Sequence, residues 1–292
     1  MVPEHIRALP CWSGDVQASP LEGGLSNEIW KVTDQAGEHV VRFGPDLPFH
    51  HVERAREVMT ARAASAAGFG PKVEYAAPGV SVVEFIAART WSAADMRAAP
   101  DRIGSLLKSF HAQMCAQVSG AAFLFWPFHV IRDYARTISA GRSAFTKDLD
   151  GFLDLNAKLE AAQIPMPIIF GHHDLLPANI LDDGKRLWLI DYEYAGFGTA
   201  MFDLAGAASN AEMSHDETDL LLRAYLGYTP DAPFMRAFDA MQCASLLREA
   251  MWAMVSDLHM AAPGADYKTY ARENLDRLAA SLAAFTQKHG TL

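Results

Sequence analysis

The segment from residue 172 to residue 191 carries the side chains best suited to chemistry. His172, Asp174 and Asn179 stand in the spacing H-x-D-x-x-x-x-N, and Asp191 follows twelve residues after Asn179, at the end of an apolar run. Transfer of a phosphoryl group from a nucleotide uses one carboxylate to accept the proton of the attacking hydroxyl, while an amide and a second carboxylate hold magnesium. We therefore predict Asp174 as the catalytic base and Asn179 and Asp191 as metal ligands, with ATP and Mg²⁺ as cofactors.

The first sixty residues contain groups that suit nucleotide phosphates. Gly23-Gly24 would let backbone N–H groups approach a phosphate, because glycine has no Cβ to block the contact. Arg42 ends an apolar strand-like run, and its guanidinium fork can pair with phosphate. Glu57 is the carboxylate expected to hold Arg42, with Glu53 one helical turn earlier as its rival. The predicted nucleotide-binding residues here are Gly24, Ser26, Asn27, Arg42 and Glu57.

The elements that must position these residues change in type along the chain. Residues 1–86 predict a small β-rich lobe, with strands at 28–32, 39–43, 72–75 and 80–86 and a helix over 52–67. Residues 87–292 predict a larger, mainly helical lobe with helices at 92–118, 128–141, 146–163, 201–226, 231–259 and 266–286 and short strands at 168–170, 180–181 and 187–190. This order predicts an α+β, protein-kinase-like bilobal fold.

The order of elements also predicts a hinge between the lobes. Glu84-Phe85-Ile86 follows the last strand of the small lobe, where backbone N–H and C=O groups would read the nucleotide base. We include Glu84 and Ile86 among the nucleotide-binding residues. Because backbone atoms would read the base, the sequence leaves the choice between ATP and GTP open. Farther on, Asp203 is expected to cap a helix or to brace the catalytic loop.

Composition excludes several classes of protein. No segment reaches the roughly 18 uninterrupted apolar residues of a membrane helix. The N-terminus lacks the basic region followed by an apolar region that marks a secretory signal, so we do not expect secretion. The three cysteines have neither metal-ligand nor disulfide spacing, as expected in the reducing cytoplasm. A formal charge of -10 argues against nucleic acid and is compatible with a cationic substrate. We expect a cytoplasmic protein without a membrane partner. A homodimer is compatible with the sequence, which leaves the oligomeric state open.

Several motifs together resemble the choline/ethanolamine kinase group within the aminoglycoside-phosphotransferase-like kinases. The matching pieces are residues 23–27, Arg42-Phe43-Gly44, Gly70-Pro71-Lys72, residues 172–179 and Ile190-Asp191-Tyr192-Glu193-Tyr194-Ala195. The resemblance runs over nearly the whole chain. It implies transfer of the γ-phosphate of ATP to the hydroxyl of a small amino alcohol, with choline as the first candidate and ethanolamine as the second.

The resemblance also implies a substrate pocket in the C-terminal part. Residues 248–252 and 266–271 look like the segment that builds the pocket in this family. A trimethylammonium group has no hydrogen to donate, so aromatic faces with an acidic neighbour hold it best. Several eukaryotic members have a second tryptophan where this chain has Glu249, and a more acidic pocket would suit a primary ammonium. The implied substrate residues are Glu193, Glu249, Trp252, Tyr267 and Tyr270.

Two other functions stay open at this stage. One is a kinase for a different cationic hydroxyl compound, such as thiamine or an aminoglycoside. The other is a pseudokinase that binds a nucleotide or a cation without catalysis. The presence of Asp174, Asn179 and Asp191 together argues against the pseudokinase, which is free to lose at least one of them.

Overall fold

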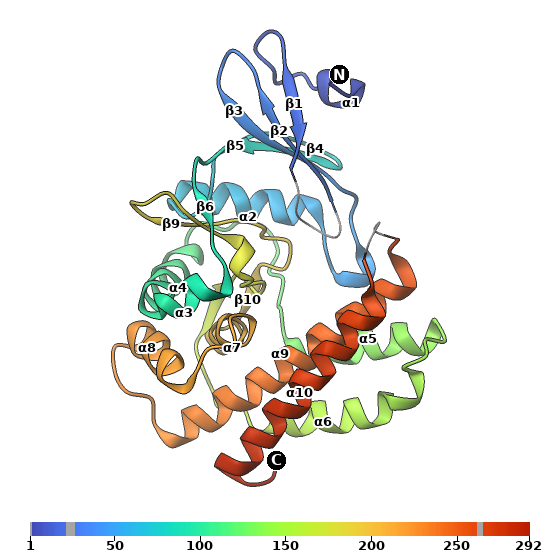
Figure 1. Cartoon of the computed structure of the whole chain (residues 1–292), viewed down its shortest axis with the longest axis vertical. Helices are drawn as coiled ribbons and strands as arrows, with labels where there is room; N and C mark the ends of the chain where they lie inside the picture. The colour runs from blue at the N-terminus through green and yellow to red at the C-terminus, as the bar shows by residue number, and fades with distance from the viewer. Residues whose placement is uncertain (1, 22–26, 262–264) are drawn as a thin grey trace.

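An antiparallel sheet of five strands forms the small lobe, in the spatial order β1-β2-β3-β5-β4 (Figure 1). At the hairpin between β2 and β3, Asp34 Oδ1 accepts from the N–H groups of Ala36 and Gly37 at 2.7 and 3.1 Å. Buried side chains of the sheet pack on Ile6 of helix α1 (Glu4–Arg7). The strands are β1 (Gln17–Pro20), β2 (Glu28–Thr33), β3 (Glu38–Phe43), β4 (Val73–Ala77) and β5 (Val80–Glu84).

The structure, a computed structural model, describes residues 2–21, 27–261 and 265–292. The predicted phosphate-binding residues Gly24 and Ser26 lie outside the described residues. Helix α2 (Arg54–Ala66) lies between the sheet and the large lobe (Figure 1). The carbonyl of Phe69, just after α2, accepts a hydrogen bond of 2.8 Å from the N–H of Leu189, so this end of the small lobe is bound directly to the large lobe.

Helices build the large lobe around the long helix α9 (Ala232–His259). Helix α9 packs against α5, α7 and α10, and 17 of its 28 residues are buried, which makes it the centre of the larger core. The other helices are α3 (Ala93–Ala98), α4 (Pro100–Met114), α5 (Pro127–Ala140), α6 (Leu149–Ala161), α7 (Ala200–Asn210), α8 (His215–Leu226) and α10 (Tyr267–His289). No helix among the described residues is both long and apolar enough to span a bilayer.

Short strands in the large lobe position the residues predicted to do chemistry. Strand β7 (Ile168–Gly171) pairs with β10 (Gly196–Thr199), and it ends directly before His172. Strands β6 (Arg89–Thr90), β8 (Ile180–Asp182) and β9 (Leu187–Leu189) form a second small sheet. The loop of residues 172–179 therefore begins at one sheet and ends at another.

The expected β-rich lobe followed by a helical lobe is present, with differences in detail. The expected helix over 92–118 divides at Ala99, because the residue before Pro100 is driven away from helical angles and here has φ -143° and ψ 57°. The expected helix over 201–226 also divides, because Ser214 and Glu217 form a capping box that begins α8. The sequence analysis does not predict strands β1, β6 and β10, since each is short and has no apolar run like those of β7, β8 and β9.

Candidate active site

One buried carboxylate, that of Asp203, holds the start of the catalytic loop, residues 172–179, through hydrogen bonds. Asp203, in the first turn of α7, accepts from the N–H groups of His172 and His173 at 2.8 and 2.7 Å, and His111 Nε2 lies 2.8 Å from Asp203 Oδ2. Burial alone would raise the pKa of Asp203, but the charges and hydrogen bonds of neighbouring imidazoles hold it below its usual range. Asp203 therefore braces the loop, one of the two roles expected from the sequence.

His172 connects the loop to the segment that carries Asp191. Its Nε2 lies 3.0 Å from the carbonyl oxygen of Ile190, which can only accept, so Nε2 carries the proton. Its Nδ1 is then free to accept the N–H of Asp174 at 3.3 Å. His172 is thus a neutral structural link, and burial lowers its pKa.

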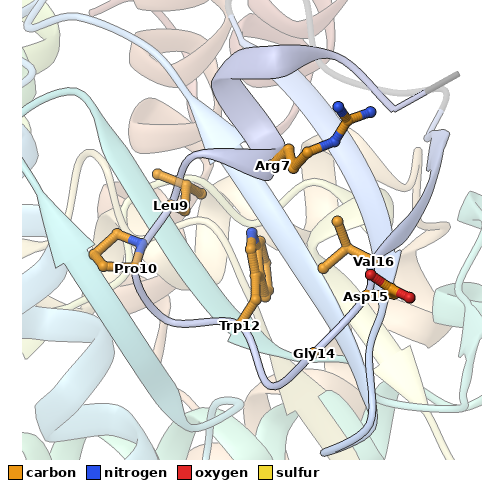
Figure 2. A pocket seen from close by; sticks show the side chains of 7 residues that line it. All are labelled: Arg7, Leu9, Pro10, Trp12, Gly14, Asp15 and Val16. Carbon is orange, nitrogen blue, oxygen red and sulfur yellow. The ribbon is translucent and has the colours of Figure 1, made fainter.

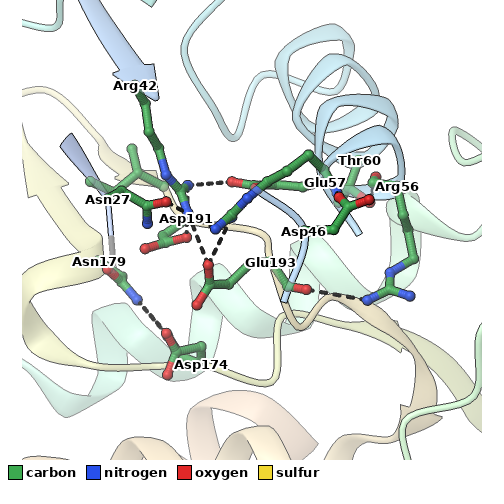
Figure 3. Close-up of polar contacts among 12 residues, drawn as sticks. Asn27, Arg42, Asp46, Arg56, Glu57, Thr60, Asp174, Asn179, Asp191 and Glu193 are labelled. Atoms are coloured by element: carbon green, nitrogen blue, oxygen red, sulfur yellow. Dashed lines mark hydrogen bonds and ion pairs between the residues drawn. The ribbon is translucent and has the colours of Figure 1, made fainter. Parts of the chain in front are cut away.

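Asp174 and Asn179 lie in direct contact. The side-chain Nδ2 of Asn179 donates to the backbone carbonyl of Asp174 at 2.9 Å and to its Oδ2 at 3.1 Å (Figure 3). The backbone carbonyl of Asn179 accepts the N–H of Ile190 at 3.0 Å, so Asn179 also lies beside the residue that precedes Asp191. Burial, followed by the charge of Asp191, raises the pKa of Asp174 well above its usual value, and Arg248 opposes this rise.

Arg42 gathers three carboxylates at the boundary between the lobes (Figure 3). Its Nη1 pairs with Glu57 and donates to Asp191 Oδ1 at 3.1 Å, while its Nη2 donates to Glu193 Oε2 at 2.9 Å. Glu57, rather than Glu53, is therefore the partner of Arg42 from α2. Asp191 has a left-handed backbone with φ 66°, which aspartate tolerates better than most residues.

Arg54 belongs to the same cluster, and no motif in the sequence indicates it. Its guanidinium donates to Glu57 Oε2 at 2.7 Å, to Glu193 Oε2 at 2.9 Å and to Asn27 Oδ1 at 2.9 Å. Asn27 is the one residue of the predicted glycine-rich turn that the structure describes and that was expected to bind nucleotide. Through Arg54 it is linked to the charged cluster.

The expected hinge has one backbone donor left for a ligand. The N–H of Glu84 donates to the carbonyl of Lys72 at 2.9 Å, and the N–H of Phe85 donates to the carbonyl of Glu38 at 3.0 Å. The first two N–H groups of the hinge are therefore occupied by the sheet. Ile86 is left as the candidate donor to a nucleotide base.

Four of the residues implied as substrate-binding lie together at the meeting of α9 and α10. The ring of Trp252 meets Tyr267 and Tyr270 edge to face, with centroids 6.0 and 6.3 Å away and interplanar angles of 75° and 79°. The hydroxyl of Tyr270 donates to Glu249 Oε1 at 2.9 Å. Glu193, the fifth, lies instead with Arg42 in the charged cluster.

Arg248 is a second charged residue that sequence reasoning passed over. Its side chain is buried, and its guanidinium carbon lies 4.6 Å from the ring centroid of Tyr194. Its Nη1 donates to Glu249 Oε2 at 2.8 Å. The sequence holds a signal for it, because Arg248 is a charged residue within an otherwise apolar stretch of α9.

Cavity volume alone does not single out this site, because the hollow lined by Arg42, Arg54 and Glu57, of about 460 Å³, is smaller than one elsewhere. A hollow of about 590 Å³ lies beside α1 and is lined by Arg7, Leu9, Pro10, Trp12, Gly14, Asp15 and Val16 (Figure 2). None of these residues is among those predicted to act on a nucleotide or a substrate. The convergence of charged side chains around Arg42 and Asp174 is the more informative feature.

Comparisons with known proteins identify the family of this chain. A sequence model described as choline/ethanolamine kinase matches residues 18–238. Probable choline kinase 2 of Arabidopsis thaliana is 25% identical, with 90% of this chain and 84% of that protein covered. Probable ethanolamine kinase of the same plant is 27% identical, and the match covers 80% of this chain and 71% of that protein.

Solved structures show the same likeness. The crystal structure of a choline/ethanolamine kinase family protein from Mesorhizobium loti has a TM-score of 0.77 and 25% identity, and the match covers 97% of this chain and 95% of that one. Spectinomycin phosphotransferase, 12% identical with a TM-score of 0.64 and with 91% and 94% covered, shares the fold. The predicted α+β, protein-kinase-like bilobal fold is confirmed.

Proposed function

Because this chain belongs to the choline/ethanolamine kinase family, and is therefore a small-molecule phosphotransferase, we propose that it transfers the γ-phosphoryl group of ATP to the hydroxyl of a small amino alcohol, most readily choline. The observation that carries this proposal is the contact of Asp174 with Asn179, beside the segment that leads to Asp191. In the proposal, residues 1–86 bind the nucleotide and residues 87–292 supply catalysis and the substrate pocket.

In the proposed reaction the acceptor oxygen attacks the γ-phosphorus of ATP. The bond from that phosphorus to the β–γ bridging oxygen breaks, ADP leaves, and Asp174 accepts the hydroxyl proton. Positioning of the two reactants and stabilisation of the phosphate charges provide most of the rate in such reactions. The Arg42 side chain, fixed by Glu57, is the cation proposed to face the nucleotide phosphates.

The donor set of Asn179 and Asp191 fits Mg²⁺, which prefers oxygen ligands and usually takes one or two protein groups. The NH₂ group of Asn179 is occupied by Asp174, so its amide oxygen is the atom left for a cation. Among the described residues, no group of three or more His, Cys, Asp or Glu side chains could hold a metal by itself. When bound, Mg²⁺ would neutralise charge on the phosphates.

The acceptor end of the proposed site is the cluster of Trp252, Tyr267 and Tyr270. Rings that meet at 75° and 79° offer faces in more than one direction, which suits a cation without hydrogen-bond donors. Trp252 is fixed by the hydrogen bond from its Nε1 to the hydroxyl of Tyr194 at 2.9 Å. This arrangement favours choline as the acceptor.

The test is release of ADP from Mg-ATP with a panel of acceptors: choline, ethanolamine, its monomethyl and dimethyl derivatives, thiamine and kanamycin. We expect the highest kcat/KM with choline, a steady fall as methyl groups are removed, and no turnover when Mg²⁺ is chelated. Phosphorylation of kanamycin or thiamine in preference to every amino alcohol would contradict the proposal. Binding of ATP without turnover on any acceptor would favour the pseudokinase.

A further inference from the structure

Both carboxylate oxygens of Glu249 are already engaged. Oε2 accepts from Arg248 Nη1 at 2.8 Å, and Oε1 accepts from the hydroxyl of Tyr270 at 2.9 Å. The Glu249 side chain is 19% exposed and the Arg248 side chain only 4%. The carboxylate at the edge of the aromatic cluster is therefore neutralised by a cation buried behind it.

Arg248 packs on Tyr194, the residue that fixes Trp252 of the aromatic cluster. Its guanidinium lies over the ring of Tyr194, whose hydroxyl accepts the indole N–H of Trp252. Within the described chain, Nε and Nη2 of Arg248 have no hydrogen-bond partner. Because arginine keeps its charge in proteins, a permanent positive charge with spare donors lies beside Glu249 and Tyr194, next to the aromatic cluster.

This charge arrangement treats the two candidate ammonium groups differently. A primary ammonium carries three donors, and it loses free energy when it leaves water unless acceptors replace that hydration. The carboxylate that touches the aromatic cluster, Glu249, already has its charge paired with Arg248 and one hydrogen bond on each oxygen. A trimethylammonium group needs no acceptor, and the ring of Tyr270 and the face of Trp252 not stacked on His50 are suited to it.

We propose that Arg248 determines the specificity of the acceptor pocket: by pairing with Glu249, it makes the pocket select a quaternary ammonium alcohol over a primary one. Arg248 acts through Glu249, so it is a positioning residue and not a catalytic one. The inference rests on the proposed kinase function and extends it to the class of acceptor.

The experiment measures kcat/KM for choline and for ethanolamine with Mg-ATP, and compares their ratio between variants. We expect Arg248→Met to lower the choline-to-ethanolamine ratio about tenfold, mainly through a lower KM for ethanolamine, because Glu249 regains a free charged oxygen. Arg248→Lys keeps the charge and should restore a ratio within about threefold of the wild type. Partial unfolding of a sample would lower kcat/KM for choline and for ethanolamine by the same factor, so it would not disturb the ratio that is compared.

Tyr270→Phe is the second variant, since it releases the other oxygen of Glu249 but keeps the aromatic face and Arg248. Its ratio should fall between those of the wild type and Arg248→Met. A wild-type ratio that is unchanged in Arg248→Met, or an equal fall in Arg248→Lys, would overturn this inference while the kinase function stands. A wild type that phosphorylates neither alcohol would overturn the proposed function and this inference with it.

Discussion

Arg54 donates a hydrogen bond of 2.9 Å to Glu193, and this contact joins helix α2 of the small lobe to the segment after Asp191 in the large lobe. Arg42 donates to the same carboxylate oxygen, also at 2.9 Å. Two arginines thus face three carboxylates, those of Glu57, Asp191 and Glu193. Burial and the charge of Asp191 raise the pKa of Glu193, while the two arginines oppose the rise.

The first prediction concerns Arg54→Ala. Loss of this guanidinium leaves an additional unpaired negative charge where the proposed nucleotide phosphates bind. Because a hydrogen bond to a charged group contributes about 1.5 kcal/mol or more, we expect the KM for ATP to rise about tenfold. Steady-state kinetics at saturating choline measure this change. Arg223→Ala, exposed on α8, is the matched control, and an equal KM for ATP in both variants would refute the assignment of Arg54.

The second prediction concerns Asp203→Asn. The new NH₂ group would face a backbone N–H of the catalytic loop, and His111 would lose its anionic partner. Breaking one side of a buried charged network costs about 3 kcal/mol, so the free energy of unfolding should fall by that amount in urea denaturation. Asp216→Asn, exposed in the first turn of α8, should stay within about 0.5 kcal/mol of the wild type. Equal stability of the two variants would show that Asp203 does not brace the loop.

The third prediction concerns pH and His50. The His50 ring is 1% exposed, lies 2.8 Å from the Ser256 hydroxyl and stacks on Trp252 with centroids 5.1 Å apart. Burial, reinforced by the charges of Arg248, His51 and His259, lowers its pKa to about 2 from 6.5. As the pH falls, His50 therefore takes up a proton in the unfolded chain before it does so in the folded one. Stability is complete above the unfolded pKa and is lost as the pH falls below it.

His50→Gln replaces the imidazole with a side chain that does not titrate, so the contribution of His50 to the pH dependence of stability disappears. Between about pH 6.5 and about pH 5.5, the variant should lose about 1 kcal/mol less unfolding free energy than the wild type. Urea denaturation at both pH values provides the measurement. His129→Gln, on an exposed position of α5, is the control and should follow the wild-type dependence. Identical pH dependence in His50→Gln and the control would contradict the buried neutral state of His50.

The parts of the site that sequence predicted are those carried by local spacing. Asp174 and Asn179 are five residues apart in one loop, and Arg42 and Glu57 are fifteen residues apart on adjacent elements. Arg54 and Glu193 meet across 139 residues, and no pattern within either segment indicates that contact. Helices, lobe order and the apolar strands β7, β8 and β9 followed from composition, while strands β1, β6 and β10 did not, because their pairing depends on distant partners.

The acceptor pocket shows the same limit. The family resemblance implied Trp252, Tyr267 and Tyr270 as aromatic faces and Glu249 or Glu193 as the negative charge. Arg248 precedes Glu249 in the sequence, but only the folded helix shows that its side chain turns inward and pairs with Glu249. Whether a carboxylate is free or paired depends on packing, which spacing along the chain does not reveal.

Asp174→Ala is the most direct test of the central claim that this carboxylate is the base of a phosphoryl transfer. Turnover of choline with Mg-ATP should fall at least about a hundredfold, the usual contribution of a general base. The Kd for Mg-ATP, measured by calorimetry, should stay within about threefold of the wild type, because the predicted phosphate contacts come from Arg42 and the small lobe. Asp150→Ala, exposed on α6, is the control and should keep full activity. Near-normal turnover in Asp174→Ala, or loss of ATP binding equal to the loss of turnover, would contradict the account.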